Sequence, residues 1–213
     1  PLRTHIDNTL ATLRSARSLA LELGIKVALE NHAGDLQARE LKALIEEAGT
    51  EFVGACIDSG NPLWVAESPY VTLEHLAPHI LMSHIRDSIV LEHPRGALVQ
   101  WVALGDGTTN MPEWARLYQE KCPHTHFTLE IISSIAPRVV NYLDPEFWTV
   151  YPDTPAWEFA RFLQLVKGSN PNFVPTLTAN WTEPDPAYRA ALEVQQRRQV
   201  EKSVRYAREV LGI

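Results

Sequence analysis

The chain has 213 residues, of which 45% are hydrophobic and 21% are charged, a composition typical of a globular protein with a sizeable core. Its formal net charge of −7 gives no support to a nucleic-acid partner or an anionic membrane surface. No apolar run approaches the roughly 20 residues of a membrane span. The two cysteines, Cys56 and Cys122, form no paired motif, so we expect reduced thiols in a reducing, cytoplasmic compartment, with a single disulfide as the alternative.

Up to residue 132, apolar strand-like runs alternate with amphipathic helices. The first helix, for example, places Ile6, Leu10 and Leu13 at steps of three and four and ends at Gly24. Asp35 is expected to cap the second helix. Helices are predicted over residues 5–23, 36–48, 71–77 and 111–121, and strands over 25–30, 51–58, 79–85, 97–104 and 126–132. This alternation is typical of parallel α/β structure.

The pattern changes after residue 132. Residues 133–155 are rich in Pro, Tyr and Trp and are expected to form a long ordered loop, followed by a helix at 156–167. Residues 168–186 contain four prolines and read as an extended connection to a charged helix at 187–211. We therefore divide the chain into a catalytic part, residues 1–167, and a linker with a C-terminal helix, residues 168–213.

Polar side chains stand at the ends of four of the predicted strands: Glu30, Asp58, His84 and Glu130. Because the carboxyl ends of parallel strands share one face, we expect these side chains to converge there. Each residue alone could simply begin a solvated loop. Four in register favour a site, because buried charges without partners are rare. Three carboxylates and one imidazole favour Mn²⁺, Mg²⁺ or Co²⁺, and so many oxygens make Zn²⁺ less favoured.

The segments ALENHAG, GACIDSGNP, MSHIRDS, ALGDG and TLEII resemble the xylose-isomerase-like TIM-barrel superfamily of sugar isomerases and epimerases. The resemblance runs from about residue 5 to 132, and more loosely to 167. It implies an α/β fold, a closed (β/α)₈ TIM barrel with one divalent ion at its C-terminal face. It also implies that Glu30, Asp58, His84 and Glu130 are the metal ligands and that Glu30 and Glu130 are the catalytic acid/base pair. Since four strands carry these ligands, we expect the chain to cover the C-terminal half of a barrel, about four strands, with a C-terminal helical extension.

This ligand set defines a reaction intermediate rather than a product. Removing a proton next to a carbonyl creates an enediolate, which a divalent cation stabilises; Mn²⁺ is expected first, with Mg²⁺, Co²⁺ and Zn²⁺ as alternatives. One glutamate takes the proton and the second returns it on the other face. We therefore favour a sugar or keto-sugar isomerase/epimerase. A lyase or dehydratase acting on a keto-sugar or keto-polyol through the same intermediate is the runner-up, and a non-catalytic polyol-binding barrel is the third interpretation.

Four further residues are expected to contact the sugar substrate. Asn31 and His32 follow Glu30 directly, and support of a neighbouring ligand is the alternative role for His32. Asn61 follows Asp58 by three residues. Arg86 stands where many relatives carry lysine in an H-x-K-D motif, and a surface ion pair with Asp87 is its alternative.

A DNA-repair branch of the same superfamily resembles the chain at the four ligands but needs additional ones for a three-metal cluster. Asn61 stands in place of a histidine of that branch, and residues 99–101, Val-Gln-Trp, in place of its Asp-x-His segment. With those ligands gone and an acidic charge balance, DNA repair is disfavoured. We expect a small-molecule sugar as partner, no nucleic acid, no membrane, and a homo-oligomer formed where strand edges are left unpaired.

Overall fold

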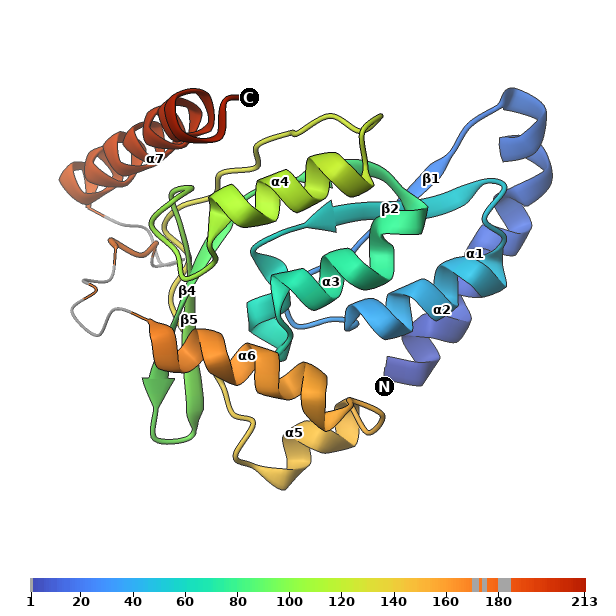
Figure 1. Ribbon diagram of the computed structural model, residues 1–213, viewed down its shortest axis with the longest axis horizontal. Coiled ribbons are helices and arrows are strands. Elements are labelled where there is room, and N and C mark those ends of the chain that lie inside the picture. The colour runs from blue at the N-terminus through green and yellow to red at the C-terminus, as the bar shows by residue number, and fades with distance from the viewer. Residues whose placement is uncertain (1, 170–172, 174–175, 180–184) are drawn as a thin grey trace.

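A computed structural model describes residues 2–169, 173, 176–179 and 185–213 (Figure 1). Its helices are α1 (Leu2–Leu23), α2 (Ala38–Ala48), α3 (Pro69–Leu76), α4 (Met111–Lys121), α5 (Pro145–Val150), α6 (Ala156–Gly168) and α7 (Pro186–Tyr206), with short turns η1 (Asn61–Val65), η2 (Ala77–His79) and η3 (Ala207–Leu211). Its strands are β1 (Val27–Glu30), β2 (Val53–Asp58), β3 (Ile80–His84), β4 (Asp87–His93), β5 (Gly96–Val102) and β6 (Arg138–Val140). Within the described residues, no helix is long and apolar enough to cross a membrane.

Strands β1, β2 and β3 form a parallel sheet in that order. The register pairs Asp58 with His84, so β2 and β3 end together, and it pairs Glu30 with Cys56, so β1 ends two residues earlier. In Figure 1 the arrow of β2 points toward the β4–β5 hairpin and α7, which marks that side as the C-terminal face of the strands. The strand expected at 126–132 is reduced to a parallel bridge between Ile85 and Leu129, so the prediction of a full strand there was wrong.

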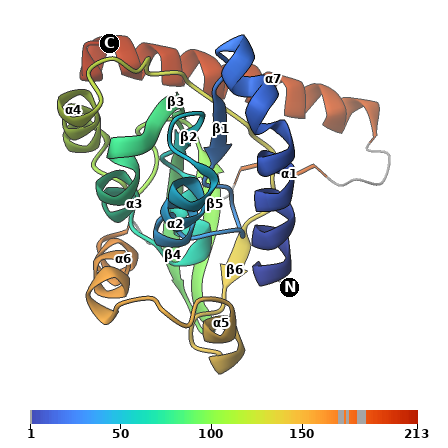
Figure 2. The same cartoon turned by 90° about the vertical axis from the view of Figure 1, so that its right-hand side faces the viewer.

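The helices expected between the strands form an arc around the parallel sheet. Each of α1, α2, α3 and α4 packs against the next, as Figure 2 shows from the side. In α2 the expected apolar stripe is buried, with Leu41, Leu44 and Ile45 each less than 5% exposed. The start of α2 differs from the prediction: Gln37, and not Asp35, holds the N-cap position, because Glu40 accepts a hydrogen bond from the Gln37 backbone N–H (2.9 Å).

A buried carboxylate also holds the start of α2. Glu67 is 4% exposed and accepts hydrogen bonds from the Ala38 backbone N–H (3.0 Å) and from the Thr72 hydroxyl. Burial raises the pKa of Glu67 to about 7, although these two hydrogen bonds oppose the shift. The folded protein therefore holds this proton more tightly than the unfolded chain does.

Replacing Glu67 by Gln should remove the contribution of this carboxyl group to the pH dependence of the unfolding free energy. Because the folded pKa lies above the unfolded value, the stability that wild type gains from the Glu67 proton is complete below pH about 4.5. It is lost as pH rises to about 7, by up to about 3 kcal/mol. We expect the difference in unfolding free energy between wild type and Glu67→Gln to fall across this window and to stay flat above it. Urea unfolding at several pH values measures it, with exposed Glu120→Gln as control; a difference independent of pH would contradict the shift.

The chain after β3 differs most from the prediction. Residues 87–93, to which no strand was assigned, form β4, which pairs with β5 in an antiparallel hairpin from Asp87–Val102 to His93–Gly96. Residues 133–155 are not a continuous loop, because β6 extends this hairpin sheet and α5 follows it. The reason is that a short strand is stabilised mainly by its partners across the sheet, and a local pattern does not contain them.

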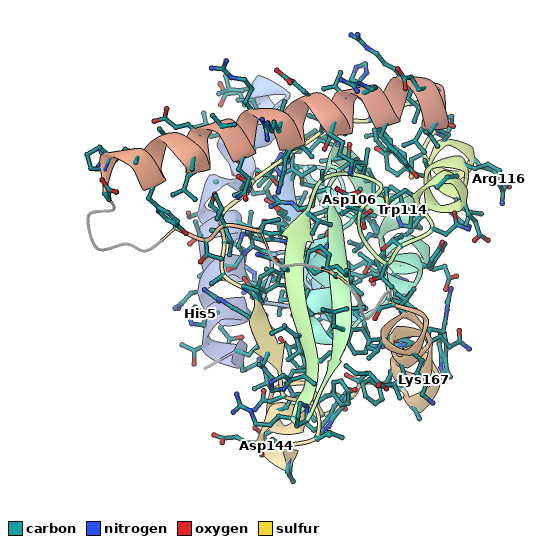
Figure 3. All side chains as sticks on the ribbon, turned by 90° about the vertical axis from the view of Figure 1, so that its left-hand side faces the viewer. His5, Asp106, Trp114, Arg116, Asp144 and Lys167 are labelled. Atoms are coloured by element: carbon teal, nitrogen blue, oxygen red, sulfur yellow. The ribbon has the colours of Figure 1, made fainter. Side chains whose placement is uncertain are left out.

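Helix α4 occupies residues 111–121, as predicted, and fills the space between α3 and the strands with aromatic rings. Trp114 is fully buried, stacks on Tyr118 at 5.4 Å, and donates a hydrogen bond from Nε1 to the Pro69 carbonyl (3.0 Å). Figure 3 shows Trp114 inside the molecule below α7.

The Trp114→Phe variant should therefore lose about 1–3 kcal/mol of unfolding free energy, because it keeps an aromatic ring but loses the buried hydrogen bond to the Pro69 carbonyl. Trp157→Phe is the matched control, because Trp157 is 55% exposed. Chemical denaturation of both variants provides the measurement, and equal stability of the two would contradict the assigned hydrogen bond.

Candidate active site

The structure brings Glu30, Asp58, His84 and Glu130 together at the C-terminal face of the parallel strands. His84 Nδ1 lies 3.3 Å from Glu30 Oε2 and 3.3 Å from Glu130 Oε2. One oxygen each from Glu30, Asp58 and Glu130 lie within 4.8 Å of one another. Glu30 ends β1, at one edge of the sheet, and Glu130 follows the residue that bridges to Ile85 beyond β3, at the other edge. The convergence expected from the strand ends is therefore observed.

Two observations indicate that these side chains could bind a divalent cation. Buried atoms of three of them, Asp58 Oδ2, His84 Nδ1 and Glu130 Oε2, have no partner with hydrogen-bond geometry within the described residues, and the two oxygens lie beside the Arg86 guanidinium. Ligand atoms about 2.1 Å from an ion lie about 3.0 Å apart at right angles, close to the 3.3 Å separations at His84. Metal binding itself stays a prediction.

The orientation of Asp58 is fixed by its backbone neighbours. Asp58 is fully buried, and its Oδ1 accepts hydrogen bonds from the N–H groups of Gly60 (2.7 Å) and Asn61 (2.8 Å). Burial raises the pKa of Asp58 to about 6, against the opposing effects of Arg86 and the two N–H groups. The second oxygen of this carboxyl group, Oδ2, is left without a hydrogen bond.

Arg86 lies among the candidate ligands rather than on the surface. Its side chain is 2% exposed, its Nε lies 2.6 Å from Asp58 Oδ2 without hydrogen-bond geometry, and its Nη2 contacts Glu130 Oε2. Its guanidinium carbon lies 4.5 Å over the Trp101 ring. The positive charge of Arg86 offsets part of the negative charge of these carboxyl groups. Substrate contact by Arg86 stays a prediction.

The alternative that Arg86 pairs with Asp87 at the surface was wrong. Asp87 is 1% exposed and accepts hydrogen bonds from the N–H groups of Ser88 (2.9 Å), Gly105 and Gly107 (both 3.1 Å). A Cβ at Gly107 would lie 2.0 Å from Asp87 Oδ1, so only glycine admits this contact. Asp87 thus holds the Gly-Asp-Gly loop against the start of β4, directly after Arg86.

Both asparagines that follow the first ligands are buried and bonded to the site. Asn31 donates to the Asp58 carbonyl (2.9 Å) and accepts from the Asp58 N–H (2.8 Å), which ties β1 to β2. Asn61 donates to Glu30 Oε1 (3.2 Å) and to the Asn31 carbonyl (3.1 Å), and its buried Oδ1 has no partner within the described residues. These contacts position Glu30 and Asp58, while contact of either asparagine with substrate stays a prediction.

His32 lies apart from the four converging side chains, on an exposed turn. It lines a groove of about 860 Å³ with residues at the start of α1, including His5, and with Glu146 and Val150 of the α5 region. His5 also lines a smaller pocket that contains Glu30. Contact of His32 with substrate stays a prediction.

Two residues at the site were not predicted. Cys56 precedes Asp58 by two residues, and its sulfur lies within 4.8 Å of ligand atoms of Glu30 and His84. The period of two along a strand could have indicated it. Burial, with Glu30 and Asp58 nearby, raises the pKa of the Cys56 thiol to about 12, so it is not a ready ligand. Trp101 packs against Arg86 from the hairpin, for which the local sequence gave little signal.

Parallel strands with acidic residues at their C-terminal ends, surrounded by helices, define an α/β protein of the TIM-barrel class. The family model of xylose isomerase-like TIM barrels matches residues 2–148, and the chain belongs to this family. The predicted fold class is thus confirmed. Among solved structures, the chain is similar to a xylose isomerase domain protein from Planctomyces limnophilus, with 24% sequence identity and a TM-score of 0.47. The alignment covers 59% of this chain and 45% of that protein, so the chain spans less than half of its length. No curated protein matches the chain.

Proposed function

We propose that this chain carries the proton-transfer site of a divalent-metal-dependent sugar or keto-sugar isomerase/epimerase. The observation that supports it most is the position of two glutamates, Glu30 at the end of β1 and Glu130 beside the bridge to Ile85, each 3.3 Å from His84 Nδ1. A pair of carboxylates that face one another across a substrate can remove a proton from one face of a carbon and return it on the other.

In the proposed reaction, different residues of the chain orient the carboxylates, transfer the proton and bind the metal. Glu30 is held by Asn61, and Glu130 is contacted by Arg86, so each carboxylate has a fixed direction. One of them takes the proton next to the substrate carbonyl, and the other returns it. Asp58, His84 and the two glutamates would hold Mn²⁺ or a similar ion, which when bound stabilises the negative oxygens of the enediolate. Arg86 adds a further positive charge beside Glu130.

Incubation of the purified protein with Mn²⁺ and a panel of ketoses and keto-glycosides in D₂O tests this function. We expect deuterium to enter at the carbon next to the carbonyl, together with an isomer or epimer, as read by NMR and mass spectrometry. Loss of water or of an aglycone would instead assign a lyase with the same intermediate. Mn²⁺ binding without deuterium entry for any substrate would favour a non-catalytic polyol-binding barrel.

A further inference from the structure

Helix α7 lies outside residues 2–148, the segment that the family model matches, yet one of its side chains contacts the backbone beside the site. Gln196 makes two hydrogen bonds to the backbone just after Glu130. Its Nε2 donates to the Ile131 carbonyl (2.6 Å), and its Oε1 accepts from the Ser133 N–H (2.8 Å). A carbonyl and an N–H two residues apart are the groups that a neighbouring strand would pair, so the Gln196 amide takes the place of a strand partner.

The segment that carries Glu130 needs such support. It is joined to Ile85 by two backbone hydrogen bonds, from Ile85 N–H to the Thr128 carbonyl (2.6 Å) and from Glu130 N–H to the Ile85 carbonyl (3.0 Å). It forms a bridge rather than a regular strand. Within the described part of the chain, no other group hydrogen-bonds the Ile131 carbonyl or the Ser133 N–H. Gln196 therefore fixes the backbone directly beyond Glu130.

A second set of contacts fixes α7 itself. Ser203 is fully buried and accepts a hydrogen bond from the Leu104 N–H (3.0 Å), and Lys202 pairs with Asp106 (2.6 Å). The Tyr206 ring covers Gly105, where a Cβ would lie 2.3 Å from it. In Figure 3, α7 crosses above the β4–β5 hairpin with Asp106 beneath it. Gln196 and Ser203 are seven residues apart and share one face of the helix, so anchoring Ser203 orients Gln196.

We propose that α7 is part of the active site and that Gln196 is a positioning residue for Glu130. Gln196 touches no candidate metal ligand side chain, and it acts through the backbone of Ile131 and Ser133. This inference rests on the proposed function of Glu130. It also joins the C-terminal helix to the catalytic part, whereas the sequence alone assigned that helix to a separate segment.

Gln196→Met tests the proposal, because methionine has similar length and helix propensity but cannot make either hydrogen bond. We expect kcat for deuterium exchange and Mn²⁺ affinity each to fall about 10–100-fold, as typically follows loss of a group that orients a ligand, with a smaller change in KM. Gln196→Glu is a second variant: it keeps an acceptor for Ser133 N–H but faces the Ile131 carbonyl with a second acceptor. Glu193→Gln, exposed on the same helix, is the matched control.

A double-mutant cycle with Glu130→Gln separates positioning from general stability. If Gln196 acts through Glu130, Gln196→Met has little further effect on exchange once Glu130 is replaced, whereas independent effects multiply. Equal kcat and equal Mn²⁺ affinity in Gln196→Met and Glu193→Gln would overturn the proposal, as would full multiplicativity in the cycle. If wild type binds Mn²⁺ but exchanges no substrate proton, the proposed function fails, while Mn²⁺ titration by calorimetry still reports on Gln196.

Discussion

Replacing either glutamate by glutamine, Glu30→Gln or Glu130→Gln, should lower proton exchange by roughly 10²–10⁴-fold. Glutamine keeps an oxygen at nearly the same position but has no basic oxygen that can take the proton. At Glu30 the hydrogen bond from Asn61 to Oε1 (3.2 Å) can persist, so the fold around the site should be unchanged. At Glu130 the charge opposite Arg86 is lost, so metal affinity should weaken more in this variant.

Deuterium exchange and Mn²⁺ titration on the same preparations separate these two effects. Glu22→Gln, exposed on α1, is the control for loss of one negative charge. A glutamine variant that binds Mn²⁺ and still exchanges at the wild-type rate would assign that glutamate a structural role. If exchange from one face only is lost in each variant, the two glutamates serve opposite faces of the substrate, in line with their places at opposite edges of the sheet.

The strand ends were the part of the site that local sequence could reveal. Glu30, Asp58 and His84 each close an apolar run, and parallel strands place such positions on one face without further information. The same logic applied to Glu130, although its segment is a bridge and not a strand. The acidic residue and its apolar neighbours were enough to predict a ligand at this position. How many residues of the segment pair with β3 depended on partners elsewhere in the chain.

The surroundings of the site depended on contacts that no local pattern contains. Arg86 stacks on Trp101, whose strand pairs with β4, so the place of its guanidinium follows from a hairpin pairing that was not predicted. Asn31 is bonded to the Asp58 backbone, a contact between two strands 27 residues apart. Gln196 reaches Ile131 across 65 residues. Side chain to backbone contacts of this kind are decided by packing, and a polar residue on a charged helix gives no sign of them.

Loss of Asp58 or His84 should abolish stoichiometric Mn²⁺ binding, and with it all deuterium exchange. Asp58→Asn is the sharper form of the first change, because an asparagine oxygen can still accept from the Gly60 and Asn61 N–H groups. It replaces Oδ2, which faces the site without a hydrogen bond, by a donor that repels both an ion and the nearby Arg86 Nε. Asp58→Ala would in addition leave Arg86 buried with one partner fewer, which destabilises the fold.

His84→Ala removes the nitrogen that lies 3.3 Å from both glutamates and lets their two charges face each other directly. Calorimetric titration at a concentration that saturates wild type gives the stoichiometry, and His124→Ala, at an exposed position, controls for loss of a histidine. Full Mn²⁺ occupancy in an Asp58→Asn, His84→Ala double variant would contradict the assignment of the metal site to this face of the barrel. Loss of binding with an unchanged melting temperature of the metal-free protein would place both residues in the site, because a folding defect would lower that temperature as well.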